Sequence, residues 1–240
     1  MEERKIPQHV AIILDGNGRW AKAKGMPRNY GHMQGAKAVE NILFDADELG
    51  IKYLTVYAFS TENWNRPQAE VAALMKILEQ YLKSSIKKSM KNNVRCRVIG
   101  ERSKLSPAIQ AAVNDLEEAT KNNTGLTFTI AINYGSRDEI TRAVRKVAKR
   151  VQNGELDADS ITEEDINNSL DTGFMPDPDL MIRTCGEQRV SNFLLWQLAY
   201  TEFYYTDIAW PDFDRNELEK AIDAYNHRTR RFGGLKKGEE

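Results

Sequence analysis

Short apolar runs alternate with segments of helical periodicity along the whole chain, and this alternation constrains the fold more than any other feature of the sequence. The apolar, β-rich runs predict strands at His9–Leu14, Tyr53–Phe59, Val94–Ile99, Leu126–Asn133 and Asp179–Arg183. Apolar residues at helical spacing predict helices at Gly35–Leu49, Gln68–Met90, Pro107–Lys121, Arg137–Gln152 and Asn216–Arg228, with a short one capped by Thr162. Strands separated by helices favour an α/β fold, a mostly parallel central sheet surrounded by helices.

The composition and charge of the 240 residues favour one soluble domain, residues 1–240, with a core at about 9–234. The formal net charge of −1 lacks the basic excess that general nucleic-acid binding requires, so we expect no nucleic-acid partner. The N-terminus has no signal-peptide pattern, and no apolar run approaches membrane-spanning length. Cys96 and Cys185 fit no metal-ligand spacing. These features together predict a cytoplasmic protein.

Polar, ionisable and glycine residues follow three of the predicted strands. They lie in the segments 15–19, 60–66 and 183–191. Ligands of open parallel sheets bind beyond the carboxyl ends of the strands, so these segments are the candidate site. Because surface loops are polar in general, their polarity alone is modest evidence.

The first of these segments has the residue types of an anion site. Gly16 and Gly18 allow backbone N–H groups to approach a phosphate, Arg19 offers a bidentate guanidinium, and Asp15 could hold a hard cation. The alternative is a plain strand-to-helix turn with Asp15 as its cap. The pattern matches neither the dinucleotide fingerprint nor the P-loop.

The other candidate binding residues could also have ordinary structural roles. The two arginines of "RTCGEQRVSNF", Arg183 and Arg189, suit a second phosphate pocket or simple surface salt bridges. His32 could donate to a phosphate or sit satisfied at a helix start. Trp20 and Trp64 are residues of a type more often found in cores than against ligands.

Several long motifs, in order, resemble one known family. They are "HVAIILDGNGRWAKAKG", "GHMQGAKAV", "LTVYAFSTENWNRP", "INYGSRDEI", "DLMIRTCGEQRVSNFLLWQLAYTEFYYTDIAWPDFD" and "RRFGG". Together they resemble the cis-prenyltransferases, or isoprenyl transferases, with the bacterial undecaprenyl diphosphate synthases most similar. The resemblance runs from about residue 9 to 234.

The resemblance implies an activity and its partners. The family condenses farnesyl diphosphate with successive isopentenyl diphosphates into a long cis-polyprenyl diphosphate, the precursor of the lipid carrier of bacterial cell-wall synthesis. It implies Mg2+, a homodimer and an elongated apolar tunnel for the growing chain. A barely soluble product further suggests transient membrane contact, peripheral to the inner face of the plasma membrane.

The resemblance also implies roles for individual residues. Asp15 and Glu202 correspond to magnesium ligands, Asp15 being also catalytic, and Asn63 to the proposed proton acceptor. The residues around the allylic diphosphate correspond to Gly16, Asn17, Gly18, Arg19, Trp20, Arg28 and His32. The mobile segment that closes on the substrates corresponds to Ser60, Thr61, Glu62, Trp64 and Arg66. The isopentenyl diphosphate pocket corresponds to Arg183, Arg189, Val190 and Ser191, and a C-terminal motif reaching a partner subunit to Arg231 and Gly233.

Physical chemistry qualifies some of these roles. An amide is a poor base, so Asn63 either accepts the proton or orients the substrate while a diphosphate oxygen takes it. The helix Val71–Ile86 and the strand Leu126–Ile132 are either tunnel walls or ordinary core. Leu126 corresponds to a tunnel-end position, which predicts a long product. Cys185 departs from the family pattern, which has glycine or another small residue there.

Two alternative functions differ in class. A non-catalytic partner subunit would lack the ionisable site residues, which are all present here. Another phosphate-binding α/β transferase would be expected to carry a P-loop or a dinucleotide fingerprint, and neither is found. Trans-prenyltransferases require aspartate-rich DDxxD motifs, which this sequence lacks.

Overall fold

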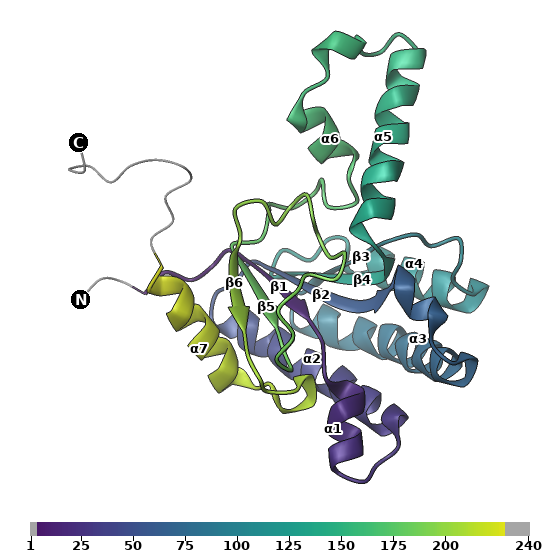
Figure 1. Cartoon of the computed structure of the whole chain (residues 1–240). Coiled ribbons are helices and arrows are strands. Elements are labelled where there is room, and N and C mark those ends of the chain that lie inside the picture. The colour runs from purple at the N-terminus through teal and green to yellow at the C-terminus, as the bar shows by residue number, and fades with distance from the viewer. Residues whose placement is uncertain (1–3, 229–240) are drawn as a thin grey trace, which may run out of the picture.

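The computed structural model describes residues 4–228 (Figure 1). Its strands are β1 (His9–Ile13), β2 (Tyr53–Ser60), β3 (Arg95–Ile99), β4 (Thr127–Tyr134), β5 (Leu180–Arg183) and β6 (Glu202–Tyr205). Its helices are α1 (Asn17–Ala23), α2 (Arg28–Glu48), α3 (Gln68–Lys91), α4 (Pro107–Thr120), α5 (Ser136–Gln152), α6 (Glu163–Ser169) and α7 (Arg215–Asn226). Short 3₁₀ turns lie at η1 (Thr61–Asn65), η2 (Ala158–Ser160) and η3 (Trp210–Asp212).

The strands described within residues 4–228 form one sheet in the order β3-β4-β2-β1-β5-β6, and every neighbouring pair is parallel. The α/β fold with a parallel sheet is therefore confirmed. Because all strands run the same way, the segments that follow β1, β2 and β5 emerge at one edge, as the sequence predicted. In the register, Ile13 at the end of β1 lies beside Tyr57 and Arg183.

The two faces of the sheet are covered differently. Val10 and Ile12 of β1 point into a core cluster that also holds buried residues of α2, α3, α4 and α7. Ala11 and Ile13 point to the other face, where Phe193 and other residues of the irregular segment 190–201 pack. Helices thus cover the first face, while much of the second is covered by irregular chain.

The helices α5 and α6 project from the body of the molecule (Figure 1). Thr162 caps α6 as predicted, with its hydroxyl accepting from the Asp165 N–H in a capping box. Of the helix and strand contacts in the described chain, those of α5 are chiefly with α6. This leaves part of their apolar surface without cover from the body.

Two parts of the fold differ from the sequence prediction. The helix predicted from Gly35 begins at Arg28, directly after Pro27 in extended conformation. Gly31 and Gly35 interrupt the apolar pattern there because they allow α1 to approach: a Cβ at either glycine would lie 2.0 Å from an oxygen of Asn17. The strand β6 was not predicted at all. It is only four residues long and none of them is fully buried.

Candidate active site

The carboxyl edge of the sheet brings the first and third predicted segments into direct contact. Arg183 is the last residue of β5, and Asp15 lies two residues after β1. Arg183 Nη2 donates to Asp15 Oδ2 at 3.0 Å, and its Nη1 donates to Ser191 Oγ at 2.8 Å and to the carbonyl of Arg189. With a side chain only 5% exposed, Arg183 is held in one place by these partners.

Asp15 is a half-buried carboxylate that stays ionised. Burial by itself raises its pKa, but hydrogen bonds from Arg183, Arg19 and the Gly16 N–H outweigh burial and hold the pKa below its usual value. Arg19 Nη2 lies 3.1 Å from Asp15 Oδ1. The charge of Asp15 is therefore shared between two guanidinium groups at neutral pH.

The turn after Asp15 explains how Cys185 is accommodated. Gly16 has φ of +98°, and a Cβ there would lie 2.7 Å from Cys185 Sγ, so only glycine fits. Cys185 itself has φ of +68°, the left-handed region that favours glycine. The backbone at Cys185 is thus the one that a glycine would adopt, and the thiol packs against Gly16.

Arg19 joins the Asp15 cluster to the exposed end of the third segment. Its Nη1 lies 3.3 Å from Glu187 Oε1, while Arg189 Nη1 pairs with the other oxygen of Glu187. The Arg189 side chain is 63% exposed. Asp15, Arg19, Glu187 and Arg189 form a continuous row of alternating charge along this edge.

A second group of cations surrounds Glu70 in the first turn of α3. Glu70 Oε1 lies 3.1 Å from Arg66 Nη1, 3.2 Å from Arg28 Nη2 and 3.5 Å from His32 Nε2. Burial lowers the pKa of His32 more than Glu70 raises it, so this imidazole is neutral at pH 7. The guanidinium of Arg28 lies over Gly18, where a Cβ would come within 2.7 Å of it.

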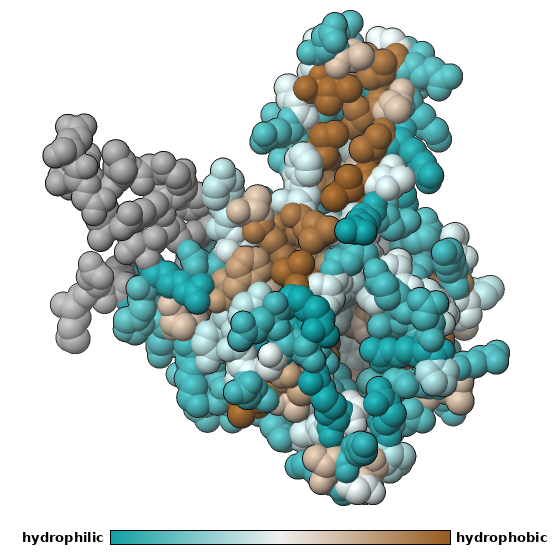
Figure 2. Space-filling model, viewed as in Figure 1, coloured by the Kyte–Doolittle hydropathy of each residue, from teal (hydrophilic) through white to brown (hydrophobic). Residues whose placement is uncertain are grey.

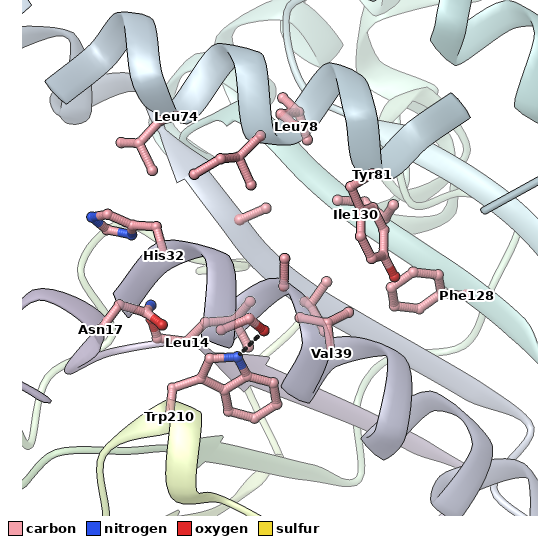
Figure 3. A pocket seen from close by; sticks show the side chains of 15 residues that line it. Leu14, Asn17, His32, Val39, Leu74, Leu78, Tyr81, Phe128, Ile130 and Trp210 are labelled. Carbon is pink, nitrogen blue, oxygen red and sulfur yellow. Dashed lines mark hydrogen bonds between the residues drawn. The ribbon is translucent and has the colours of Figure 1, made fainter. Parts of the chain in front are cut away.

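An apolar pocket begins beside these polar groups and runs between α2 and α3 (Figure 3). His32 and Asn17 lie at one end, and Tyr81, Phe128 and Ile130 lie at the other. Its remaining lining comes from Leu14, Gly35, Ala36, Val39, Val56, Ala58, Leu74, Ile77, Leu78 and Trp210. The predicted wall segments Val71–Ile86 and Leu126–Ile132 both contribute, although Leu126 itself is buried in the core and does not line the pocket.

Two polar atoms at the mouth of this pocket lack hydrogen-bond partners. Asn17 Oδ1 and His32 Nε2 are both buried, and neither makes a hydrogen bond. Unsatisfied buried polar atoms are costly, and they are retained where a ligand or water supplies the missing partner. They mark the junction between the charged edge and the apolar pocket as a place for a ligand with a polar head.

The segment Ser60–Arg66 is tied to the site by its own side chains. Asn63 Oδ1 accepts from the Ser60 N–H at 3.1 Å in a capping box. Trp64 packs edge-on against Phe59, and its Nε1 donates to Asn133 at 2.7 Å. Trp64 is therefore a structural anchor at the edge of the core.

Glu62 connects the segment 60–66 to the chain that follows the segment 183–191. Its carboxylate accepts from the Thr61 hydroxyl at 3.0 Å and from Asn192 Nδ2 at 2.9 Å, next to Ser191. Val190 packs against the second core cluster. Trp20, by contrast, lies on α1 outside both core clusters, stacked on Tyr30.

The structure does not bring Glu202 to Asp15 within one chain. Glu202 begins β6, level with Leu180 and Val10, so it lies toward the amino edge of the sheet. Its carboxylate pairs with Arg228 at 2.8 Å. Its metal role stays a prediction, while Arg231 and Gly233 lie outside the described residues.

The donor set at Asp15 fits magnesium only with help from a ligand. Among residues 4–228, no three carboxylate, histidine or cysteine side chains gather as a metal cluster. Magnesium is commonly held by one or two carboxylates together with substrate phosphates and water. The ionised Asp15 carboxylate, beside the guanidinium groups of Arg19 and Arg183, suits that arrangement.

Sequence reasoning missed three side chains that organise this edge: Glu70, Glu187 and Asn192. Glu70 follows Arg66 by four residues on a helix, and Glu187 lies between Arg183 and Arg189, so charge patterning could have indicated both. Asn192 gave no such signal, because its contacts depend on tertiary structure.

Comparison with known proteins decides the family. The family model described as putative undecaprenyl diphosphate synthase matches residues 13–233. The chain belongs to the isoprenyl transferase family. An isoprenyl transferase of Fusobacterium nucleatum is 55% identical to it over 98% of this chain and 99% of the relative. One of Clostridium perfringens is 51% identical over 98% and 92%.

Solved structures agree with this membership. The crystal structure of a lavandulyl diphosphate synthase from Lavandula x intermedia, in complex with dimethylallyl diphosphate, has a TM-score of 0.92 at 42% identity and covers 95% of this chain and 98% of its own. That of a probable undecaprenyl diphosphate synthase from Campylobacter jejuni has a TM-score of 0.79 at 35% identity, covering 95% and 99%. The α/β fold with a parallel sheet and the isoprenyl transferase activity are those predicted.

Proposed function

We propose that this isoprenyl transferase extends farnesyl diphosphate with successive isopentenyl diphosphates to a long cis-polyprenyl diphosphate, undecaprenyl diphosphate. The observation that carries the proposal is the junction of two cationic groups with the mouth of an apolar pocket. A substrate with a diphosphate head and an isoprenoid tail matches that junction. The crystal structure of the lavandulyl diphosphate synthase, which has a similar fold, contains dimethylallyl diphosphate, an allylic diphosphate.

In this proposal the two cationic groups bind different substrates. Arg28 and His32, with Arg66 and the backbone at Gly18, bind the allylic diphosphate at the pocket mouth. Arg183, Arg189 and Ser191, with Val190 beside them, bind isopentenyl diphosphate. Two unit charges about 4 Å apart repel by roughly 4 kcal/mol at an effective dielectric near 20, so two diphosphates need several cations between them. Arg19, which pairs with Asp15 and Glu187, adds a further cation at this edge.

Asp15 is the proposed magnesium ligand. Magnesium, when bound with the allylic diphosphate, stabilises the negative charge of the departing diphosphate. Arg183 and Arg19 keep the Asp15 carboxylate ionised and oriented, which keeps it available as a ligand. The arginines supply further stabilisation of the leaving group once they bind the diphosphate, because their charge then lies where negative charge develops.

For Asn63 we propose the orienting role. Its amide oxygen already accepts the Ser60 backbone hydrogen bond, which supports a part in shaping the 3₁₀ turn beside the substrates. An amide is also a poor base, so a diphosphate oxygen takes the proton from the new cation. Single-turnover condensation unchanged in Asn63→Ala would exclude both the orienting and the proton-accepting role.

The growing chain enters the apolar pocket. Burying a methylene is worth about 0.8 kcal/mol, so each isoprene unit gains several kcal/mol in a dry apolar space. Tyr81 and Phe128 lie at the far end of the pocket, and Leu126, just before β4, is buried in the same core cluster as Phe128. We expect Leu126→Ala to change product length, and unchanged product lengths would count against a tunnel that reaches Leu126.

A homodimer and a membrane contact complete the proposal. Figure 2 shows apolar side chains gathered along α5 and α6 and on the body below them. Exposed apolar residues of these segments include Val144, Ile161, Leu195 and Tyr200. We propose that a second copy covers this face.

In the described part of the chain, no helix has the length and apolar character to cross a bilayer. We propose a cytoplasmic enzyme whose contact with the inner face of the plasma membrane is peripheral and transient.

Product analysis tests the proposed function. Purified protein is incubated with farnesyl diphosphate, labelled isopentenyl diphosphate and magnesium, and the dephosphorylated products are separated by length. We expect a long product that is lost with Asp15→Ala or with EDTA. A short product would contradict the chain length, and no incorporation by folded protein would favour the non-catalytic partner subunit.

A further inference from the structure

The connection between α1 and α2 projects from the lower end of the molecule (Figure 1). We call residues 19–33 the α1–α2 corner. The helix α1 ends in a Schellman motif, in which the Gly25 N–H donates to the Lys22 carbonyl at 3.1 Å and the Met26 N–H to the Ala21 carbonyl at 2.9 Å. Gly25 has the left-handed φ of +68° that this motif uses. Backbone hydrogen bonds therefore hold the corner in a defined shape.

The corner is basic, although the chain as a whole is not. The sequence from Gly16 to Val39 contains no aspartate or glutamate, while the formal net charge of the 240 residues is −1. The basic residues of the corner are Arg19, Lys22, Lys24 and Arg28. A cluster of this kind attracts an anionic surface at distances up to about the Debye length of 8–10 Å.

Acidic residues of neighbouring elements neutralise only part of this charge. Each acid that faces Arg19 or Arg28 is shared with an arginine outside the corner; these acids are Asp15, Glu70 and Glu187. Lys24 Nζ lies 4.0 Å from Asp212 Oδ1, a long distance for an ion pair. Lys22 is exposed in the last turn of α1. The corner therefore keeps a positive surface.

Apolar and aromatic side chains lie among these charges. Met26 is 41% exposed and Met33 is 50% exposed. Trp20 stacks on Tyr30 with ring centroids 6.0 Å apart, and Lys24 Nζ lies 4.2 Å from the centroid of the Trp20 ring. Figure 2 shows pale brown residues among teal ones at this end of the molecule. Lysine together with tryptophan, tyrosine and other apolar residues is typical of segments that lie in the interface of a bilayer.

Lysine and methionine are also exposed near the end of α3, which allows a comparison. Lys87 and Met90 lie there, in a stretch without acidic residues at 80–100. The strand β3 begins soon after them, so this surface lies toward the amino edge of the sheet. Asn17 and His32 at the pocket mouth, by contrast, belong to the same two helices as the corner. The corner therefore lies beside the pocket mouth, and the end of α3 does not.

We propose that the α1–α2 corner docks on the surface of a bilayer that contains anionic phospholipids. Lys22 and Lys24 lie near the headgroup phosphates, while Met26 and Met33 enter the boundary between headgroups and acyl chains. Docking in this way places the mouth of the apolar pocket beside the lipid. The inference rests on the proposed function, whose product is barely soluble, and it names the surface by which the enzyme meets the membrane.

Vesicle binding by the full chain, without substrates, tests the proposal. The protein is sedimented with vesicles of phosphatidylcholine and phosphatidylglycerol, and with vesicles of phosphatidylcholine alone. We expect Lys22→Gln to lower the partition onto the anionic vesicles about fivefold, as for one lysine near such a surface. Met26→Ser should lower it several-fold through lost apolar burial. The matched controls Lys87→Gln and Met90→Ser should stay within about twofold of wild type, because they lie outside the corner.

Salt and catalysis separate docking from other effects of these variants. Binding of wild type to the anionic vesicles should weaken as salt is raised, because salt screens the attraction between lysines and lipid phosphates. Lys22 and Met26 have no place in the proposed substrate sites. Without vesicles, both variants should therefore incorporate isopentenyl diphosphate at the wild-type rate.

Amide hydrogen exchange locates the contact on the chain. Anionic vesicles should slow exchange in residues 22–34 and leave residues 80–94 unchanged. Absent binding, equal binding to both kinds of vesicle, or equal losses in the Lys22 and Lys87 variants would each overturn the proposal. Protection at α5 and α6 in place of the corner would overturn it too. In protein that still incorporates isopentenyl diphosphate, all of these results leave the proposed function intact.

Discussion

The two cationic halves of the site differ in how firmly the protein holds them. Arg183 is 5% exposed, and its two terminal nitrogens are held by Asp15, Ser191 and the Arg189 carbonyl. Arg28 and Arg66 are largely exposed and share a single carboxylate, Glu70. The first half is preorganised, whereas the second can rearrange around a ligand.

The difference fits what each substrate of the proposed function demands. Isopentenyl diphosphate is the same molecule in every cycle, so a rigid pocket suits it. The allylic substrate grows by one isoprene unit per cycle. Its diphosphate head stays the same, but its isoprenoid tail needs more space after each cycle. A rearrangeable half beside the apolar pocket meets that need. Substitutions in each half test whether one is rigid and the other can rearrange.

The largest effect is expected from the buried half. Arg183→Ala leaves Asp15 with Arg19 as its remaining guanidinium partner, and losing a charge-assisted hydrogen bond of this kind costs about 1.5–3 kcal/mol of unfolding free energy. We expect activity to fall by at least about three orders of magnitude, since charge stabilisation in the transition state is lost as well. Steady-state kinetics and urea unfolding measure the two effects.

The exposed neighbour Arg189 is the matched control for Arg183. Arg189→Ala should raise KM for isopentenyl diphosphate by about 10- to 100-fold, the range of a charge-assisted hydrogen bond, and leave stability nearly unchanged. Should Arg183→Ala fail to fold, Arg183→Lys keeps the charge and loses the forked geometry. Equal stability losses in the Arg183 and Arg189 variants would contradict a rigid half.

A smaller and more selective effect is expected from the exposed half. Arg66→Ala should raise KM for farnesyl diphosphate about tenfold and leave KM for isopentenyl diphosphate within a factor of two. Its unfolding free energy should stay within about 0.5 kcal/mol of wild type, as for most surface substitutions. A loss shared equally by both substrates would mean that the halves are not separate.

A pH effect on stability is expected from His32. Because its pKa is lower in the folded protein than the value near 6.5 of an unfolded histidine, the unfolded chain binds more protons between those two values. Stability therefore rises with pH through that window and declines as pH falls below about 6.5. His32→Asn should flatten the profile of urea midpoints between pH 5 and 8.

Because His9 is also buried, the pH profile of wild type must be compared with that of His32→Asn. Burial lowers the pKa of His9 to about 4, which contributes a slope of the same sign in both proteins. The difference between wild type and His32→Asn isolates His32. Parallel profiles in the two proteins would show that His32 is not neutral and buried at the pocket mouth.

The smallest effect is expected at Cys185. Glycine would relieve its left-handed backbone but lose the thiol contact with Gly16 and add freedom to the unfolded chain. The relief of backbone strain stabilises the folded protein, while the lost contact and the freer unfolded chain destabilise it. Cys185→Gly should therefore change the unfolding free energy, measured by urea unfolding, by less than about 1 kcal/mol. Loss of activity in this variant would give the thiol a role that the account does not.

Sequence reasoning reached the sheet and its functional edge because both follow from local patterns. Apolar runs located β1, β2 and β4 to within a residue or two. Parallel connections then placed Asp15 and Arg183 at one edge. The beginning of α2 was missed, because Gly31 and Gly35 serve contacts with α1 that no periodicity encodes.

The roles of individual charges were harder to predict. Sequence spacing pointed to Asp15, Arg19 and Arg183 as phosphate or metal groups, but it did not show which arginine is buried. Burial separates Arg183 from Arg189 although they lie six residues apart. Likewise Glu70 acquires Arg28 and His32 as partners only when α2 and α3 pack together.

The most direct test is a crystal structure with magnesium, isopentenyl diphosphate and a non-reactive allylic diphosphate analogue bound together. We expect Arg183 to keep its contacts with Asp15 and Ser191 while Arg28 and Arg66 leave Glu70 for the allylic diphosphate. Arg28 and Arg66 still paired with Glu70, or Arg183 drawn away from Asp15, would contradict this expectation.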